Sequence, residues 1–173
     1  VVLRGFSIES TVGCGGTLVA AFSDPRGDRA MRYLVLACDF DGTVATDGTV
    51  RDETFAALQR LRESGRKLIL VTGREIDDLL KVFPRIDIFD RVVAENGALL
   101  YRPANREHKT LGEAPSAEFV QALRASGISP LSVGHCIVST WQPHEGKVLE
   151  TIRDLGLELQ VIFNKGAVMI LPS

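Results

Sequence analysis

The stretch Leu34-Val35-Leu36-Ala37-Cys38-Asp39-Phe40-Asp41-Gly42-Thr43 decides the fold that we expect for this chain. Its apolar run, 34–38, lacks polar alternation and predicts a strand that is buried on both faces of a sheet. The run ends in two carboxylates one residue apart, Asp39 and Asp41. One carboxylate can attack phosphorus, and a second carboxyl can protonate the leaving oxygen and then activate water. Gly42 would let a phosphate approach the backbone closely. A plain Asp-Gly turn after a strand is the alternative interpretation.

The composition is that of a globular domain, or of one core with a small insertion. The chain has 173 residues, of which 45% are hydrophobic, and this suffices for a real core. Twenty Lys and Arg stand against 22 Asp and Glu, and no basic block indicates a nucleic-acid partner. No apolar run approaches the ~18 residues of a membrane span. We therefore expect a small-molecule partner, while the oligomeric state stays open.

The cysteines and histidines show no pattern of a disulfide framework or a metal site. Three cysteines, Cys14, Cys38 and Cys136, are widely spaced, which favours small buried side chains in a reducing, cytoplasmic setting. The histidines lack ligand spacing, and we do not expect them to bind a metal: His108, His135 and His144.

Residues 1–30 differ from the rest because they are rich in Gly and Ser and poorly periodic. A well-patterned sequence begins at Met31, so we expect 1–30 to be a non-native or disordered extension and Met31 to be the natural start. The glycine-rich segment 13–17 lacks the lysine of a phosphate-binding P-loop and is expected to be a plain loop.

From Met31 to about residue 100, apolar runs alternate with amphipathic segments, a pattern that predicts a parallel α/β sheet. Asp47-Gly48 is expected to form a tight hairpin turn, so the second Asp-Gly-Thr has no catalytic role. Asp52 is expected to cap the first helix, which Gly65 ends. The other expected elements are strands at 67–71 and 91–94 and a helix at 75–82.

The pattern changes beyond residue 100, where we expect a small sheet with helices on one face. This α+β insertion, 101–173, would contain helices near 116–126 and 144–155. Its strands are expected near 134–140, 157–163 and 167–171. The last two would form a hairpin around Asn164-Lys165-Gly166. Trp141 is expected to fill the core of this insertion, with stacking on a substrate as the alternative.

Polar residues follow the predicted parallel strands at their carboxyl ends, where ligands of such sheets collect. Thr72 could donate its hydroxyl to a phosphoryl oxygen, aided by the amino end of the following helix, or it could simply cap that helix. Arg74 could neutralise a phosphate, although an arginine in the first turn of a helix is more often solvated. The residues expected at this edge are Asp39, Asp41, Thr72, Gly73 and Asn96.

Three stretches together resemble the haloacid dehalogenase superfamily of phosphotransferases, in its Cof-like, type IIB branch. They are Asp39-Phe40-Asp41-Gly42-Thr43-Val44, Val71-Thr72-Gly73-Arg74 and Ala94-Glu95-Asn96-Gly97-Ala98. The resemblance implies a Rossmannoid α/β core with an inserted α+β cap. It also implies that Asp39 becomes an aspartyl phosphate, that Asp41 is the acid/base, and that both help to hold Mg2+. By the same resemblance, phosphate would lie against Gly42, Thr72 and Gly73, with Thr43, Arg74 and Asn96 near the substrate.

Two further motifs of this family are not recognisable: a lysine that opens a helix after the cap, and a GDxxND-like acidic motif. Lys165 is followed by the predicted strand 167–171, so we assign it to a hairpin turn, with a phosphate-binding lysine as the alternative. We therefore expect an incomplete core, truncated near Ser173. Its 34–38 strand would lie at an edge unless residues 17–22 cover it.

The predicted function is Mg2+-dependent hydrolysis of a small phosphate monoester, such as a sugar phosphate, through an aspartyl phosphate. With two catalytic motifs missing, we expect the 173-residue chain itself to have little activity. A phosphomutase is the enzymatic alternative, because the same intermediate can pass its phosphoryl group to a sugar hydroxyl. A non-catalytic binding or regulatory fragment is the alternative from another class.

Overall fold

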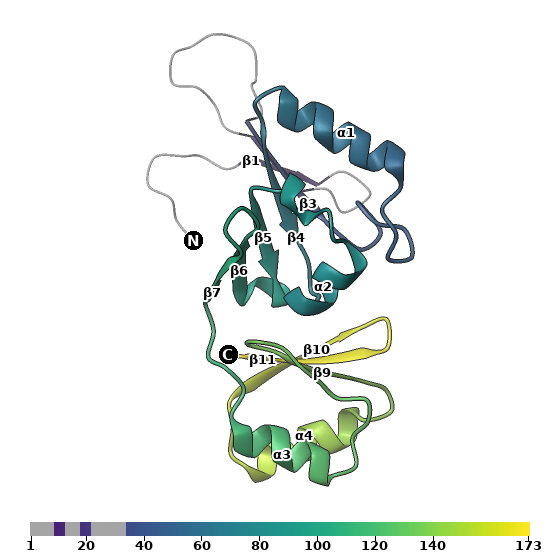
Figure 1. Cartoon of the computed structure of the whole chain (residues 1–173). Helices are drawn as coiled ribbons and strands as arrows, with labels where there is room; N and C mark the ends of the chain where they lie inside the picture. Colours follow the sequence, from purple (N-terminus) through teal and green to yellow (C-terminus); the bar gives the residue numbers. More distant parts are fainter. Residues whose placement is uncertain (1–8, 13–17, 22–33) are drawn as a thin grey trace.

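A computed structural model describes residues 9–12, 18–21 and 34–173 of the chain. Figure 1 shows two domains, one above the other, joined by an extended segment after β7. The upper domain is a five-stranded sheet with helices, and the lower one is a smaller four-stranded sheet with helices α3 and α4 on its far side. The lower sheet therefore presents its other face to the upper domain.

The first domain is built on a mixed sheet with the strand order β3-β4-β5-β6-β7. Strands β3, β4 and β5 are parallel, and β6 and β7 then add to the sheet as antiparallel neighbours. Its elements are β3 (Val35–Asp39), α1 (Asp52–Glu63), β4 (Lys67–Val71), α2 (Ile76–Val82), the 3-10 turn η1 (Ile86–Ile88), β5 (Arg91–Ala94), the 3-10 turn η2 (Glu95–Gly97), β6 (Leu99–Arg102) and β7 (Glu107–Thr110).

The expected parallel α/β pattern is confirmed, and the apolar runs form the core of this domain. Leu68 and Leu70 of β4 are fully buried, as is Val92 of β5. Leu58 on the inner face of α1 joins the same cluster. Asp47 and Gly48 both have positive φ and form the predicted two-residue hairpin, closed by hydrogen bonds between Thr46 and Thr49.

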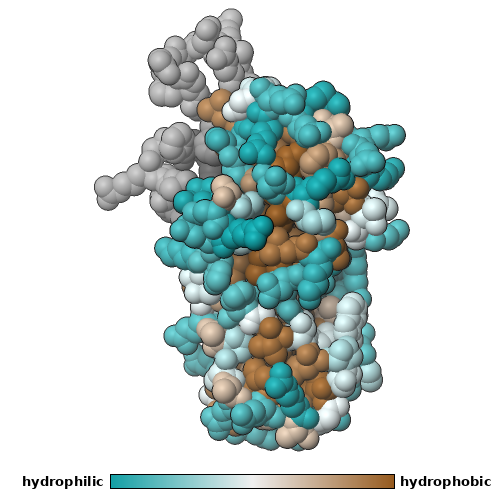
Figure 2. Space-filling view, viewed as in Figure 1, coloured by the Kyte–Doolittle hydropathy of each residue, from teal (hydrophilic) through white to brown (hydrophobic). Residues whose placement is uncertain are grey.

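The second domain, hereafter the cap, is an antiparallel sheet with the order β10-β11-β9-β8. Ser116 caps its first helix as predicted, since its hydroxyl accepts the Phe119 N–H at 3.1 Å. The helices pack on the sheet through a separate apolar cluster that includes Phe119, Leu123 and Val148. Figure 2 shows apolar residues gathered in separate areas over the two domains. The elements are α3 (Ala117–Ala125), β8 (Ser132–Val133), β9 (Val138–Trp141), α4 (Glu145–Asp154), β10 (Leu159–Asn164) and β11 (Ala167–Pro172).

The expected border between the two domains was residue 101, whereas in the structure the first sheet continues to Thr110. The stretch from Leu99 to Thr110 forms β6 and β7, which extend the first sheet by backbone hydrogen bonds. The polar strand β7 has no apolar alternation, so only its pairing with β6 defines it. The cap helices begin at Ala117.

Two local predictions are wrong. Asp52 does not cap α1: it is the first helical residue, and Arg51 occupies the cap position without a side-chain hydrogen bond. The strand expected near 134–140 is two short strands, β8 and β9, because residues 134–137 form a loop that contacts the first domain.

The amino-terminal segment contributes two short strands, β1 (Glu9–Val12) and β2 (Leu18–Ala21), which pair with each other. Strand β2 lies beside β3, so its residues agree with the alternative that this segment covers the edge, whereas residues 17 and 22 lie outside the described residues. The predictions for Cys14, Met31 and the remainder of 1–30 lie outside the described residues. Cys38 and Cys136 are free and buried, as predicted. Among the helices of the described residues, none has the length and apolar character to cross a membrane.

Candidate active site

The Asp-x-Asp loop leaves the carboxyl end of β3 and is anchored by the residue between its aspartates. Phe40 is fully buried and packs on Phe83, with ring centroids 6.0 Å apart. The backbone N–H of Phe40 donates to the Val71 carbonyl at 3.1 Å, which joins the loop to β4. Because alternate side chains point in opposite directions, burial of Phe40 turns Asp39 and Asp41 away from the core.

Gly42 occupies a left-handed turn in this loop, with φ of 86°. Its N–H donates to the Ala45 carbonyl at 2.8 Å, so this amide is already used within the loop. A Cβ added at Gly42 would meet nothing within 4 Å, which leaves the approach to the loop open. The glycine is therefore required by the backbone conformation, and its predicted contact with phosphate stays a prediction.

Asp39, the last residue of β3, is half-buried. Burial raises the pKa of its carboxyl above the ordinary value, because a charged group loses solvation there. A hydrogen bond with the Phe40 backbone opposes this rise in pKa, the nearby charge of Asp41 adds to it, and the positive charge of Lys165 lowers the pKa. Lys165, a residue of the cap, thus lies near enough to Asp39 of the first domain for its charge to affect this pKa.

Arg74 is held by two aspartates, which corrects the expectation that it is solvated. Its Nε and Nη2 donate to the two carboxylate oxygens of Asp41 at 2.8 and 2.9 Å, and its Nη1 donates to Asp78 at 2.7 Å. The guanidinium also lies 5.5 Å from the centre of the Phe40 ring. These hydrogen bonds raise the pKa of Arg74, which stays charged, and they occupy the side chain of the predicted acid/base.

Thr72 is almost completely buried at the end of β4, beside the Asp-x-Asp loop. Its hydroxyl oxygen accepts the backbone N–H of Arg74 at 3.1 Å, so it closes a turn and does not cap a helix. Helix α2 begins at Ile76, beyond Thr72, and its amino end therefore does not assist this residue. Among the described residues, the Thr72 hydroxyl donates to no other group, so its proton can still be donated to a ligand.

Gly73 and Asn96 pack against each other where β4 and β5 end. A Cβ on Gly73 would lie 2.9 Å from the Asn96 side-chain oxygen, so a larger residue would displace that amide. Asn96 has a left-handed backbone conformation and donates its amide to the Met169 sulfur of the cap at 3.3 Å. Asn96 thus lies at the contact between the two domains.

Trp141 lies on the cap face opposite the cap helices, so the expectation that it fills the core of the cap is wrong. Val138 and Thr140 of β9 are buried on the helix side, and Ser139 and Trp141 alternate with them. Ser139 bonds to Glu75 of the first domain, which shows that this face looks toward that domain. Trp141 is 53% exposed. It pairs with Ala167, close to Lys165 in the tight β10–β11 turn that was predicted.

Two glutamates join the domains, and neither was among the site residues predicted from the sequence. Glu75 accepts hydrogen bonds from two cap serines, and Glu95 is fully buried against a cap loop. Glu95 does lie inside the quoted stretch 94–98, where a charged residue directly after an apolar strand could have drawn attention. The histidines, for which no metal was expected, lie as follows: the His108 and His135 rings are tilted by 43° with centroids 4.4 Å apart, and the His144 ring contacts the Ser129 carbonyl.

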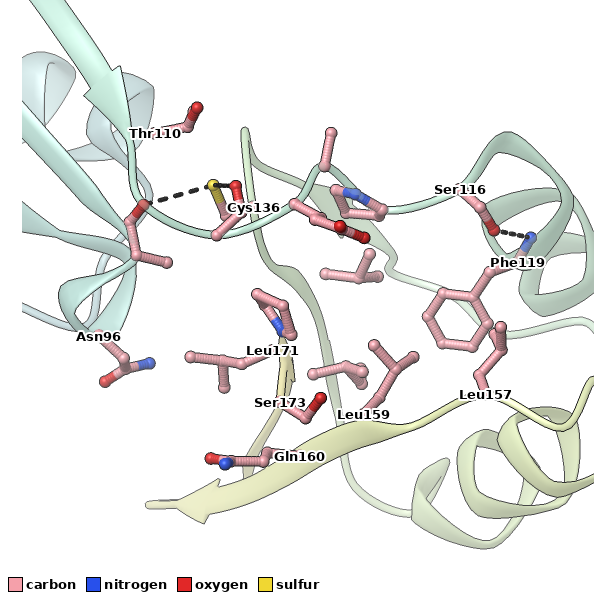
Figure 3. A pocket seen from close by; sticks show the side chains of 18 of the residues that line it. Asn96, Thr110, Ser116, Phe119, Cys136, Leu157, Leu159, Gln160, Leu171 and Ser173 are labelled. Atoms are coloured by element: carbon pink, nitrogen blue, oxygen red, sulfur yellow. Dashed lines mark hydrogen bonds between the residues drawn. The ribbon is translucent and has the colours of Figure 1, made fainter.

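A cavity of about 850 Å3 opens between the cap and the segment that joins the domains. Figure 3 shows Phe119, Leu157 and Leu159 on one side of it and Thr110 and Cys136 on another. Of the predicted site residues only Asn96 lines it, and neither aspartate does. Because Asp39 and Asp41 do not line this cavity, it is not the candidate reaction site despite its size.

The described residues offer a partial set of ligands for Mg2+. The side chain of Asp39 and the backbone of Asp41 supply oxygen donors, which this hard cation prefers, and Mg2+ is usually held by one or two carboxylates together with substrate phosphate. No group of three His, Cys, Asp or Glu side chains comes together among the described residues. The donor set thus fits a cation that a phosphate oxygen helps to hold.

The chain belongs to the haloacid dehalogenase-like hydrolase family, whose sequence profile matches residues 36–141. This match contains the Asp-x-Asp loop, the Thr72 turn and the contact at Asn96. The resemblance that the three motifs indicated is therefore confirmed.

Individual proteins that are similar to the chain support this family assignment. The chain is 33% identical over 95 residues to a pyridoxal phosphate phosphatase of Escherichia coli strain K12, a match that covers 54% of the chain and 34% of that protein. The chain thus spans about a third of the length of this curated relative. A haloacid dehalogenase-like hydrolase from Bacteroides thetaiotaomicron has a similar fold, with a TM-score of 0.65 and 14% identity over 82% of the chain and 72% of that protein. A subclass IIB sugar phosphatase also shares the fold, with a TM-score of 0.57 and 16% identity over 80% and 70% of the two chains.

Proposed function

We propose that this chain carries the nucleophile and the acid/base of a phosphomonoester hydrolase that acts on a small phosphorylated metabolite. The observation that supports the proposal most directly is the group formed by Asp39, the Arg74-bound Asp41 and the buried hydroxyl of Thr72. This group combines a carboxylate nucleophile, an acid/base and donors for phosphoryl oxygens at one edge of the sheet. Membership of a family of hydrolases agrees with it.

In the first step, a carboxylate oxygen of Asp39 attacks phosphorus and the bond from phosphorus to the ester oxygen breaks. The proton of Asp41 passes to that oxygen, so the alcohol leaves neutral. In the second step, water attacks the phosphorus of the aspartyl phosphate and gives a proton to Asp41. Inorganic phosphate leaves and the Asp39 carboxylate is regenerated.

Arg74 has a role in this scheme that its hydrogen bonds define. Both carboxylate oxygens of Asp41 accept hydrogen bonds from the guanidinium, so neither is free to contact the leaving oxygen of a substrate. An incoming phosphate offers the guanidinium a second anion of higher charge. We infer that Arg74 turns from Asp41 toward the phosphate, which frees Asp41 to carry the proton.

Mg2+ would be held by the Asp39 carboxylate and the Asp41 backbone carbonyl. When bound, this cation offsets the repulsion between the carboxylates and the phosphate. The positive charge of Arg74 and Lys165 contributes to the same balance. The expectation of weak activity for the 173-residue chain stays a prediction.

The leaving group of the substrate would lie between the strand ends and the cap face that carries Trp141. An exposed indole offers a flat apolar surface for the face of a sugar ring. A sugar phosphate is therefore the substrate class that we propose, and the similar fold of a subclass IIB sugar phosphatase supports this choice.

Phosphate release from a panel of sugar phosphates in the presence of Mg2+ tests the activity. Any turnover by this chain, which we expect to be weak, should be abolished by Asp39→Asn and unchanged by Asp47→Asn, because Asp47 lies in the structural turn of the second Asp-Gly-Thr. Turnover that survives Asp39→Asn would contradict the proposed nucleophile. An isomeric sugar phosphate as the product, in place of inorganic phosphate, would instead identify a phosphomutase.

A second measurement separates a weak enzyme from a non-catalytic fragment. Beryllium fluoride binds to a carboxylate as a phosphoryl mimic, so with Mg2+ it should raise the Tm of the wild-type chain and of Asp47→Asn. It should leave the Tm of Asp39→Asn unchanged. No shift in any of the three chains would favour a fragment without a phosphoryl site.

A further inference from the structure

Two glutamates of the first domain bind one loop of the cap from two sides. Glu75 and Glu95 come from the segments that follow β4 and β5, and both contact the cap between Ser132 and Ser139. We call these two side chains and residues 132–139 the clasp. The pairs that it joins are 40 to 64 residues apart in the sequence, so it forms only when the cap is docked.

Glu95 is fully buried and its carboxylate accepts three backbone N–H groups of the cap. The donors are His135 at 3.0 Å, Cys136 at 2.7 Å and Ile137 at 3.2 Å. A buried carboxylate is costly unless every oxygen is hydrogen-bonded, and here the amides of one loop satisfy both oxygens. The three amides of this loop therefore share one acceptor group, the carboxylate of Glu95.

Glu75 binds the same segment at both of its ends. The Ser132 hydroxyl donates to one carboxylate oxygen at 2.7 Å, and the Ser139 hydroxyl donates to the other at 2.8 Å. Glu75 therefore bridges β8 and β9 of the cap sheet. It directly follows Arg74, which binds the predicted acid/base.

Gly134 fits between the two glutamates. A Cβ at this position would lie 2.9 Å from Glu95 Oε1 and 3.1 Å from Glu75 Cγ. Its φ lies outside the left-handed region, so the backbone itself accepts alanine. The absence of a side chain at Gly134 is what allows both carboxylates to reach the loop at once.

We propose that Glu75 and Glu95 are positioning residues that together hold the cap over the strand ends in one closed arrangement. Each is the sequence neighbour of a predicted site residue, since Glu75 follows Arg74 and Glu95 precedes Asn96. The clasp therefore fixes the cap face that carries Ser139 and Trp141 relative to the ends of β4 and β5. The two carboxylates act on a single equilibrium between a closed and an open cap.

Hydrogen exchange of the full chain tests this coupling without any assay of activity. Glu95→Gln should accelerate exchange at the Cys136 and Ile137 amides about 10- to 100-fold, since it removes hydrogen bonds to a charged acceptor. The decisive variant is Glu75→Gln, which touches neither amide. We expect it to accelerate the same amides, because an open cap exposes both contacts together.

Gly134→Ala and Ser139→Ala test the same equilibrium from the cap side, and neither alters a glutamate of the first domain. Both should accelerate exchange at the Cys136 amide and make Trp141, the single tryptophan of the chain, easier to quench with acrylamide. Glu53→Gln and Glu118→Gln are matched controls on exposed helix positions, and both should behave as the wild type. If exchange became faster only at groups that contact each substituted residue, the proposed coupling between Glu75 and Glu95 would be wrong.

The effect on turnover rests on the proposed function and is measured separately. With a sugar phosphate, whose leaving group reaches the cap, Glu75→Gln should raise KM and lower kcat. With acetyl phosphate, which is too small to reach the cap, it should change neither. Equal losses with both substrates would mean that Glu75 acts on the strand ends and not through the cap. Absence of both Asp39-dependent turnover and an Asp39-dependent effect of beryllium fluoride on Tm would contradict the proposed function and leave the exchange result standing.

Discussion

The Asp-x-Asp loop and the clasp both place two acidic side chains near the ends of neighbouring strands, but they treat these groups differently. Asp39 and Asp41 remain partly exposed, and a cationic side chain, Arg74, balances the charge of Asp41. Glu95 is fully buried, and fixed neutral amides bind both of its oxygens. The proposed reactive groups thus keep hydrogen-bonding capacity for a substrate, whereas the carboxylate of Glu95 uses its capacity within the domain contact. The following changes test this difference.

The largest loss of stability is expected for Phe40→Ala. Phe40 is fully buried between the two aspartates and packs on Phe83, so its removal leaves a cavity under the Asp-x-Asp loop. We expect the free energy of unfolding to fall by about 3–5 kcal/mol, measured by urea denaturation. A loss within about 1 kcal/mol would mean that the loop does not depend on this anchor.

Glu95→Gln should be the next most destabilising change. The amide keeps one acceptor oxygen but directs an NH2 group at backbone donors, so the free energy of unfolding should fall by about 1–3 kcal/mol. Urea denaturation monitored by far-UV circular dichroism measures it, with Glu53→Gln as the exposed control. An unchanged midpoint for Glu95→Gln would remove the contrast between the two regions.

Asp39→Asn is expected to change stability in the opposite direction. The pKa of Asp39 is raised in the folded chain, so the folded state binds its proton more tightly than the unfolded state does. The resulting penalty is complete above the folded pKa and disappears below the unfolded pKa, where both states are protonated. We therefore expect Asp39→Asn to raise Tm at pH 7, with a gain that vanishes as the pH falls below about 4. A lower Tm at pH 7 would mean that the charge of Asp39 is stabilising.

The smallest expected effect is a shift in pH dependence for Lys165→Met. Lys165 lowers the pKa of Asp39, so its removal should raise that pKa further. The acid limb of kcat/KM should then move to higher pH by a few tenths of a unit, since Lys165 is exposed and solvent screens its charge. In the absence of turnover, the pH dependence of beryllium fluoride binding reports the same group. A shift toward lower pH would exclude this action of Lys165.

Much of the candidate site was predictable because its signals are local. The apolar run of β3 and the following aspartates form one short segment, and Thr72 and Arg74 follow the next strand. Parallel strands bring such ends together wherever they occur. The pairing of Arg74 with Asp41 was missed because it depends on side-chain directions that spacing does not define.

The sequence predicted the helices and the small sheet of the cap, but not where the cap begins or which face of its sheet meets the other domain. Alternation in β9 and β11 indicates two faces but does not say which of them meets the other domain. Trp141 was therefore assigned to the wrong side. Strand β7 was absent from the expected elements because its polar residues carry no periodic signal and only the hydrogen bonds with β6 define it.

The amino-acid sequence by itself determined the alternation of strands and helices, the turns at Gly48 and Gly166, and the two aspartates at the end of β3. These features depend on residues that are neighbours in the sequence, so their spacing can be read from the sequence directly. Only the tertiary structure decided that Arg74 binds Asp41, that Lys165 acts on Asp39, and that Glu75 and Glu95 hold the cap. These contacts join segments far apart in the sequence, so they follow from the docking of two separately packed domains and not from any local pattern.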